Sequence, residues 1–328
     1  MIYQLAVALA LAAVVSGKLY TDDPVQQKFL WDSFKTEHKH NFADMGEETH
    51  RFHVFLENLK LADLRNDNEL KKGGSASHGI TKFSHLSQAE FEANYLTADV
   101  SLSSNSKNIY NVERPVDETA SLVDWSGALT TAVKDQGYCG SCWAFSATEQ
   151  IESDAIRQLG KTYVLSPEQI TQCAKGAFGC GGGWTETAYT YVKNAGGLVE
   201  DSVYPYTSYQ GVTGTCKVDT SLAKVGVKGY YTITGEDQMA SYVQSTGPLS
   251  VCLDASQFNS YNGGIMSVCT QNVNHCVQAV GVDVAGGYWK VRNSWGSSWG
   301  ESGYIRLAYG KNTCAITNDP TWVETFAV

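Results

Sequence analysis

The stretch QGYCGSCWAF at residues 136–145 determines how the rest of the chain is interpreted. It overlaps residues 141–159, whose apolar spacing predicts one helix that Gly160 ends. Cys142 falls in the first turn of that helix, and Ser141 before it is a favourable N-cap residue. Because the positive end of a helix dipole stabilises a thiolate over a thiol, Cys142 has the position of a nucleophile.

Cys139 lies three residues before Cys142, so the two form a C-x-x-C motif of the kind found in thiol–disulfide exchange proteins. Such motifs follow a parallel strand, and the sequence before residue 136 indicates none. We therefore interpret Cys142 as a catalytic nucleophile and Cys139 as a structural cysteine, with redox chemistry as the alternative. The odd total of nine cysteines agrees with at least one thiol outside the disulfides.

Composition excludes several classes of protein. With 328 residues, 43% hydrophobic and 18% charged, the chain is long enough for about two domains and too apolar to be disordered. Its net charge of −10 argues against a nucleic-acid partner. Residues 2–15 are uncharged and mostly apolar but too short to span a membrane, so residues 1–17 are predicted to be a cleaved signal peptide and no membrane partner is expected.

The chain divides by its use of cysteine and histidine. Residues 18–118 hold no cysteine and six of the seven histidines, whereas residues 119–328 hold all nine cysteines and a single histidine. Helical spacing runs from residue 24 to residue 72, and residues 97–118 have the composition of an exposed connector. A mainly β half is predicted toward the C-terminus, with strands at residues 225–233, 248–254, 276–284, 288–295 and 303–309.

A thiolate nucleophile commonly works with an imidazole that acts as its acid and base. His275 is the single histidine of residues 119–328, so the sequence identifies it as the base. Without His275, Cys142 would have no base at all, which argues against a merely structural role for this histidine.

The segment around Cys142 resembles the active-site segment of papain-family cysteine proteases. VNHCVQAVG around His275 and RNSWGSSWG around Asn293 are similar to the histidine and asparagine segments of that family. The resemblance covers nearly the whole chain and is strongest to cathepsin L-like zymogens, including digestive enzymes of insect type. It implies an α+β, papain-like two-domain fold with a helical left domain, a β-barrel-like right domain and an N-terminal helical inhibitory prodomain.

The resemblance also assigns roles to four residues. Cys142 and His275 would form the catalytic pair, and the Asn293 amide would orient the imidazole without adding a third charge. Gln136 would donate a side-chain N–H to the oxyanion hole, beside the backbone N–H of Cys142. The expected reaction is thiolate attack on a peptide bond, which gives an acyl-enzyme that water hydrolyses.

A substrate-binding cleft follows from the same resemblance. Its residues would be Gly182, Gly183, Trp184, Cys252, Asn274, Cys276 and Asp319. Asp319 would lie at the floor of the second specificity pocket, where a carboxylate attracts arginine or lysine although most relatives prefer leucine or phenylalanine. No cofactor and no metal site are expected, because one histidine and bridged thiols supply no ligand set.

The resemblance further implies a disulfide framework, which pairs Cys139 with Cys180, Cys173 with Cys216, and Cys269 with Cys314. Cys252 and Cys276 remain, both at positions that line the second specificity pocket in the family. They form either a fourth disulfide or two small free thiols, and the sequence leaves both alternatives open.

Glu47, Arg51, Phe55, Asn58 and Asn66 follow a spacing similar to the prodomain helix signature of cathepsin L-like zymogens. On a helix these residues share one stripe. Prodomains of this family run through the active-site cleft in reverse and block it, which is what the resemblance implies for residues 18–118.

The histidines of that segment suggest an acid trigger, since histidine gains its charge near pH ~6.5. Our hypothesis is that His85 and its neighbours loosen the prodomain in acid and permit self-cleavage near Thr119. Exposed histidines without any such role are the alternative.

Together these features predict a zymogen of a cysteine endopeptidase that acts on protein and peptide substrates. The expected partners are its own prodomain and cystatin-type inhibitors, and the expected state is a monomer. The chain has no N-x-S/T sequon, which favours secretion to the extracellular or digestive space over lysosomal sorting. The alternative function is that of a catalytically silent homologue that binds or inhibits other proteins, although such homologues usually lose the nucleophile or the base.

Overall fold

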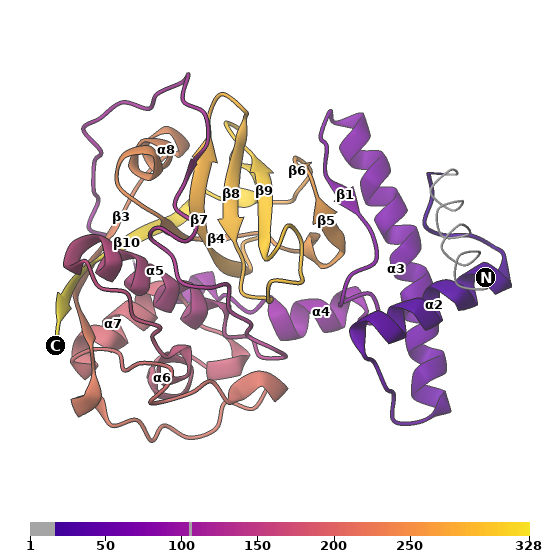
Figure 1. The fold of residues 1–328 in the computed structure, drawn as a ribbon, viewed down its shortest axis with the longest axis horizontal. Coiled ribbons are helices and arrows are strands. Elements are labelled where there is room, and N and C mark those ends of the chain that lie inside the picture. Colours follow the sequence, from indigo (N-terminus) through magenta and orange to yellow (C-terminus); the bar gives the residue numbers. More distant parts are fainter. Residues whose placement is uncertain (1–16, 105–106) are drawn as a thin grey trace.

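The structure is a computed structural model that describes residues 17–104 and 107–328. The predicted signal peptide therefore lies outside the described residues, apart from Gly17. Figure 1 shows an N-terminal group of helices beside a body that has a sheet in one half and helices in the other. Within the described ranges, no helix is long and apolar enough to cross a bilayer.

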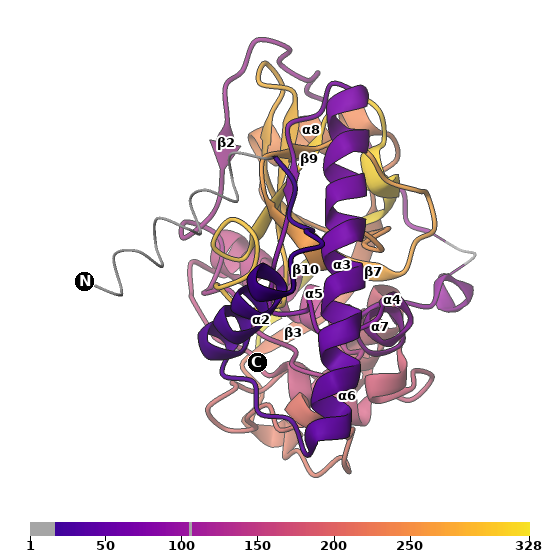
Figure 2. The same ribbon diagram turned by 90° about the vertical axis from the view of Figure 1, so that its right-hand side faces the viewer.

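The N-terminal unit is built from α2 (Pro24–His38), α3 (Met45–Lys71) and α4 (Gln88–Tyr95). The helical prediction for residues 24–72 is confirmed, with a break that the spacing did not indicate. Lys39 adopts the left-handed conformation that ends α2, and the Asp44 carboxylate accepts from two backbone N–H groups at the start of α3. The break lets α2 fold back across α3, as Figure 2 shows.

An aromatic cluster holds α2 and α3 together. Trp31 stacks on Phe34 with ring centroids 5.5 Å apart, and Phe55 of α3 packs against both rings. All three side chains are buried. A core this small contains few apolar groups, so its stability depends strongly on each of them.

The stripe of the prodomain-like motif faces the segment that links α3 to α4. Arg51 donates to the Glu90 carboxylate of α4 at 2.8 Å, while Asn58 and Asn66 hydrogen-bond backbone groups of residues 78–86. The spacing seen in the sequence therefore serves to fix this linking segment along α3.

Two buried charged residues of α3 attach the N-terminal unit to the sheet half. The Glu69 carboxylate accepts from the backbone N–H groups of Ser267 and Val268 at 3.0 and 2.9 Å. Arg65 donates to Asn259 Oδ1 at 2.7 Å. Between them, β1 (Ser77–His78) pairs with β5 (Tyr261–Gly263), so this contact combines a strand pair with charge-assisted hydrogen bonds.

The helical half contains α5 (Cys142–Leu159), α6 (Pro167–Cys173) and α7 (Thr185–Ala195). The predicted helix of residues 141–159 is confirmed, and Gly160 ends it with a φ of 65°. The expected cap is wrong: the Ser141 hydroxyl forms no capping hydrogen bond and instead lies 2.8 Å from the Tyr206 hydroxyl. A buried phenol offers this hydroxyl a partner that local sequence could not indicate.

The other half contains a twisted sheet with the strand order β3-β10-β4-β7-β8-β9-β6, with β2 paired to β7. Its strands are β2 (Val123–Asp124), β3 (Val225–Thr232), β4 (Leu249–Leu253), β6 (Ile265–Met266), β7 (His275–Asp283), β8 (Tyr288–Arg292), β9 (Tyr304–Ala308) and β10 (Asn318–Ala327). The five strands expected from the sequence are all present, and α8 (Glu236–Ser245) packs beside them (Figure 1).

Strand β10 is absent from the sequence-based prediction although it lies between β3 and β4. The strand contains Pro320, and proline cannot donate to a β-ladder. The structure accommodates it with an irregular register between Asn318 and Thr321, where Asp319 adopts a φ of 52°. Proline thus sits in a bulge, where no ladder hydrogen bond is required of it.

The expected barrel-like closure does not occur within the described residues, where β3 and β6 remain the two ends of the strand order. Val225 and Val227 of β3 pack into the core of the helical half, together with Tyr189 of α7. Because β3 reaches into that core, it cannot turn back to pair with the far edge of the sheet.

The structure contains four disulfides and one free cysteine, Cys142. The disulfides are Cys139–Cys180, Cys173–Cys216, Cys252–Cys276 and Cys269–Cys314. Cys252 and Cys276 occupy directly facing positions of β4 and β7 with their Cα atoms 4.0 Å apart. This geometry favours the fourth bridge over two free thiols.

We predict that denatured, unreduced protein gains one alkyl group when treated with iodoacetamide, because Cys142 alone is unpaired. The Cys142→Ser variant should gain none, and Cys252→Ser should gain two because Cys276 loses its partner. Intact-mass spectrometry measures each number directly. Three alkyl groups on the unmutated protein would mean that Cys252 and Cys276 are free thiols.

Candidate active site

Cys142 is the first residue of α5, at the boundary between the helical half and the sheet half. The helix is fixed to the sheet one turn later, where the Ser146 hydroxyl donates to the Val277 carbonyl of β7 at 2.8 Å. Cys142 is completely buried, and the backbone N–H of Cys276 hydrogen-bonds its thiol. Because Cys276 directly follows His275, the thiol lies beside the start of β7.

His275 begins β7, and its imidazole is held on two sides. Its Nε2 is 2.8 Å from the Asn293 side-chain oxygen, and the Trp295 ring packs against the imidazole with centroids 4.8 Å apart. All three side chains are buried. The imidazole Nδ1 has no hydrogen-bond partner among the described residues, so this nitrogen remains available for proton transfer.

Gln136 is buried beside the same loop. Its Oε1 accepts from the Ser294 hydroxyl at 2.7 Å, and its Nε2 donates to the Cys139 carbonyl at 2.9 Å. An amide nitrogen carries two hydrogens, so the second N–H of Gln136 remains for another acceptor. Its orientation is therefore fixed in advance by its neighbours, as a donor to an oxyanion requires.

Residues of the N-terminal unit lie across this cleft. The Thr97 hydroxyl donates to the Gly140 carbonyl at 2.7 Å, Ala98 N–H to the Asn274 carbonyl at 3.0 Å, and Asp99 N–H to the Gly183 carbonyl at 3.0 Å. Ala98 and Gly183 form a parallel bridge. The segment expected to be an exposed connector is thus inserted in the cleft at its beginning and exposed only further on.

Two glycines allow this close approach. A Cβ on Gly182 would lie 2.2 Å from the Thr97 carbonyl oxygen, and a Cβ on Gly183 would lie 2.5 Å from the Trp143 ring. Gly182 also has a φ of 121°, which disfavours any other residue. The wall implied by the sequence resemblance therefore accepts an extended backbone here, at present that of the chain's own N-terminal unit.

Comparison with known proteins agrees with this geometry. The profile of the papain family cysteine proteases matches residues 119–323, and that of the cathepsin propeptide inhibitor domain (I29) matches residues 31–91. The chain belongs to the papain family of cysteine proteases. It is a cathepsin L-like zymogen with an inhibitory propeptide.

Individual relatives agree over most of their length. Cathepsin L 2 of Paramecium tetraurelia is 36% identical over 307 residues, covering 92% of this chain and 93% of that protein. Digestive cysteine proteinase 1 of Homarus americanus is 35% identical and covers 88% and 92%. The structure of digestive procathepsin L 3 from Tenebrio molitor larval midgut superimposes with a TM-score of 0.79 at 32% identity, covering 90% and 98%.

The propeptide changes the electrostatics of this papain-family site by excluding water. Burial raises the pKa of the Cys142 thiol to about 11, although nearby backbone N–H groups oppose the shift. Burial likewise lowers the pKa of His275 to about 4, opposed by its hydrogen bond to Asn293. In the precursor both groups are therefore neutral near pH 7, and the charged pair expected from the helix dipole is suppressed.

The residues expected to form the second specificity pocket are brought together. Trp184, Cys252 and Cys276 form one buried apolar cluster, against which Ala98 and Leu102 of the propeptide pack. Asn274 lies at the edge of the cleft, where its carbonyl accepts from Ala98.

Asp319 is buried beside this cluster. Its Oδ2 accepts from the Trp184 indole N–H at 2.8 Å, and its Oδ1 lies 2.6 Å from Lys107 Nζ. The sequence did not indicate Lys107, because nothing in the connector marks one lysine as a pocket contact. It also did not indicate Glu186, which follows the glycine wall and lies 3.9 Å from Lys107 Nζ.

We predict that Cys142 in the intact precursor reacts with iodoacetamide at least about a thousandfold more slowly at neutral pH than in the processed protein, because a thiol pKa near 11 leaves little thiolate. The precursor rate should rise steadily with pH toward pH ~10, whereas the processed protein should show reactivity that persists in acid. Alkylation quenched at set times and followed by mass spectrometry gives the rate as a function of pH for both forms. A reactivity plateau near neutral pH in the precursor would contradict the neutral thiol.

Proposed function

We propose that this protein is the precursor of a cysteine endopeptidase in which Cys142 attacks peptide bonds and His275 is the acid and base. The observation that carries the proposal is the His275 imidazole, fixed by Asn293 and Trp295 at the strand that adjoins the one free thiol of the described chain. A structural histidine needs neither an unpartnered Nδ1 nor a neighbouring nucleophile.

The reaction follows from these groups. Once the propeptide has left, water enters, the His275 Nδ1 takes the Cys142 proton, and the thiolate attacks the scissile carbonyl carbon. The Cys142 backbone N–H and the Gln136 side chain stabilise the resulting oxyanion. His275 then protonates the leaving amine, which gives a thioester, and afterwards deprotonates the water that hydrolyses it.

The proposed domain limits are residues 1–17 for the signal peptide, 18–118 for the propeptide and 119–328 for the peptidase. The matched ranges 31–91 and 119–323 support this division. We propose release of the mature enzyme into a secretory, digestive or lysosomal compartment as a monomer. Proteins and peptides are the proposed substrates and cystatin-type proteins the proposed external inhibitors.

A basic preference in the second specificity pocket is part of the proposal. Asp319 there has its carboxylate bound to the Trp184 indole and to the ammonium group of Lys107. A buried carboxylate is stabilised by a positive partner, so removal of Lys107 with the propeptide creates a place for a basic side chain of the substrate.

The decisive experiment is a time course of purified precursor shifted from neutral pH to about pH 4.5, well below the ~6.5 of free histidine. We expect loss of the first part of the chain near Thr119 together with rising hydrolysis of fluorogenic peptides. Intact mass and fluorescence follow the two events.

The matched control is Cys142→Ala, which should stay intact and inactive under the same conditions. If precursor cleaved near Thr119 by a separate protease is also inactive on every peptide, the catalytically silent alternative replaces the proposal.

Acid triggering of the propeptide has a structural basis in two histidines. The imidazoles of His40 and His85 lie 4.0 Å apart between centroids, and His40 Nε2 and His85 Nδ1 have no hydrogen-bond partner among the described residues. Phe34 and Phe42 pack against this pair. Two imidazolium ions at this distance would repel each other in an apolar setting.

Burial, followed by the charges of His40 and Arg51, lowers the pKa of His85 to about 3, and burial also lowers the pKa of His40. A detached propeptide returns both to ~6.5 and so binds more protons than the folded one. The stability that these two neutral histidines contribute to the folded propeptide is therefore fully present above about pH 6.5 and is lost as the pH falls from ~6.5 toward 3. The Lys82 backbone and the Glu90 carboxylate oppose the lowering of the His85 pKa, whereas the charge of His38 adds to the lowering of the His40 pKa.

We predict that His85→Asn lowers the pH midpoint of processing by roughly half a unit, because one of the two proton-binding groups is lost. Gel densitometry of the precursor across a pH series gives the midpoint. His53→Asn, at an exposed position of α3, is the control and should leave the midpoint in place. Full latency of His85→Asn at neutral pH shows that the variant is folded, and an unchanged midpoint in a latent variant excludes His85 as the switch.

A further inference from the structure

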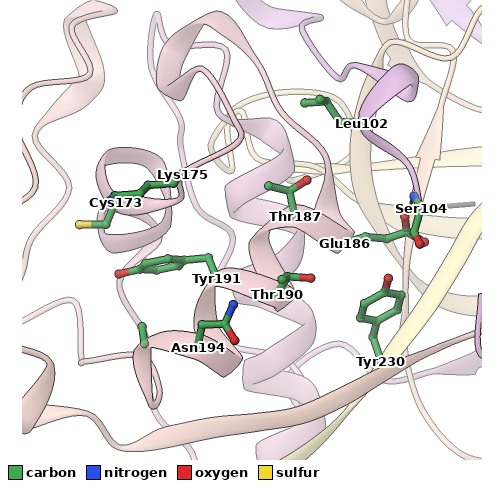
Figure 3. A pocket seen from close by; sticks show the side chains of 11 residues that line it. Leu102, Ser104, Cys173, Lys175, Glu186, Thr187, Thr190, Tyr191, Asn194 and Tyr230 are labelled. Atoms are coloured by element: carbon green, nitrogen blue, oxygen red, sulfur yellow. Dashed lines mark hydrogen bonds between the residues drawn. The ribbon is translucent and has the colours of Figure 1, made fainter. Parts of the chain in front are cut away.

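Glu186 lies in the first turn of α7 and is almost completely buried, with its side chain 2% exposed. It has no assigned role in the catalytic groups or in the pocket discussed above. Figure 3 shows its carboxylate directed toward Ser104 of the propeptide, with the Tyr230 ring nearby. A buried glutamate at this position requires an explanation, because an uncompensated buried carboxylate is strongly destabilising.

The partners of Glu186 all come from the propeptide. Its Oε2 accepts from the Ser104 backbone N–H and, at 3.3 Å, from the Ser103 hydroxyl. Its Oε1 has no hydrogen-bond partner among the described residues, and the ammonium of Lys107 lies 3.9 Å away. The site therefore holds an orphaned carboxylate oxygen beside a cation.

Lys107 connects Glu186 to Asp319. Its Nζ is 2.6 Å from Asp319 Oδ1, and the Asp319 side chain is only 1% exposed. Burial and then the charge of Asp319 raise the pKa of Glu186 to about 7, and Lys107 is the cation that opposes this shift. Two buried carboxylates of this kind share one positive charge, which departs when the propeptide is removed.

The backbone at Asp319 shows that this carboxylate is specifically oriented. Asp319 has a φ of 52°, directly before Pro320, within the irregular register of β10. A left-handed aspartate before proline is an unfavourable conformation that surrounding contacts must maintain. The contacts that maintain it here are the Trp184 indole and Lys107.

There is also space beside Glu186. A cavity of about 560 Å³ adjoins Glu186, and its lining includes Tyr191 and Tyr230 of the peptidase part and Leu102 and Ser104 of the propeptide. Because Leu102 and Ser104 belong to the propeptide, processing removes one wall and opens the cavity toward the cleft. A long side chain can then reach between the two carboxylates.

We propose that Glu186 is a second specificity-determining residue, which together with Asp319 binds the positively charged side chain of a substrate, and that Lys107 occupies this two-carboxylate site in the precursor. The inference rests on the proposed peptidase function. Arginine fits the site better than lysine, because a planar guanidinium presents separate N–H donors to two carboxylates whereas an ammonium is a point charge.

The test uses full-length precursor that is processed and then assayed on peptides with Arg, Lys or Leu in the second position before the cleaved bond. Glu186→Gln should lower the Arg-to-Leu ratio of kcat/KM by about tenfold, the effect of losing one charge-assisted hydrogen bond. Asp319→Asn should do the same, and the loss should be greater for Arg than for Lys. The charge-matched control Asp237→Asn, at an exposed position of α8, should leave the ratio unchanged.

The outcomes distinguish failure of the peptidase function from failure of the two-carboxylate site. If the unmutated, processed protein cleaves none of the peptides, the peptidase function itself fails. If it cleaves them and Glu186→Gln keeps the Arg-to-Leu ratio within about twofold, the two-carboxylate site is overturned while the peptidase function stands.

A second measurement keeps the inference testable if Glu186→Gln does not fold. Lys107→Met leaves the mature sequence intact and removes the cation from the precursor, so processing should become about threefold faster or more than that. Lys107→Arg keeps the positive charge and should process no faster than the unmutated precursor. Equal processing rates for Lys107→Met and the unmutated precursor would overturn the claim that Lys107 stabilises the precursor by occupying the Glu186–Asp319 site.

Discussion

The site depends on one buried polar contact between α5 and the sheet. Gln278 of β7 donates to Gln150 Oε1 of α5 at 3.0 Å, and Arg292 at the end of β8 donates to Gln278 Oε1 at 2.6 Å. These groups are excluded from water, so sliding α5 along the sheet would leave them unpaired at a cost of about 1–3 kcal/mol each. Because Cys142 begins α5 and His275 begins β7, the same contact fixes the nucleophile relative to the imidazole.

Burial favours neutral side chains in both parts of the chain, but the consequence differs between the cleft and the propeptide. In the cleft, Thr97 and Ala98 cover the thiol and keep Cys142 and His275 neutral, so latency is a consequence of desolvation as well as of steric blocking. In the propeptide, burial lowers the pKa of His85, and on this basis we propose that the covering unit is sensitive to acid. In the proposed function, the propeptide that suppresses the charged pair is itself destabilised by protonation, which would couple its removal to the pH of the compartment.

The sequence predicted those features that depend on residues close together in the chain. Residue spacing predicted the helix that begins at Cys142, the five regular strands and the linking stripe of α3. Motif resemblance identified the residues around His275 and Asn293. The Ser141 cap failed because a distant phenol competes for its hydroxyl, and the barrel-like closure failed because β3 enters the helical core. Both errors come from tertiary contacts between segments far apart in the chain, for which a single sequence carries no signal.

The error at β10 has a different cause, and it concerns function. Proline is unfavourable in a central strand, and the irregularity that admits Pro320 is also where Asp319 has its left-handed backbone and accepts from the Trp184 indole. In a regular strand, successive side chains point to opposite faces of the sheet, so the side chain at position 319 would have its direction set by that alternation. The bulge that makes the strand hard to recognise from sequence is also the place where Asp319 is held beside Trp184, so this departure from regular patterning coincides with a residue that we propose selects the substrate.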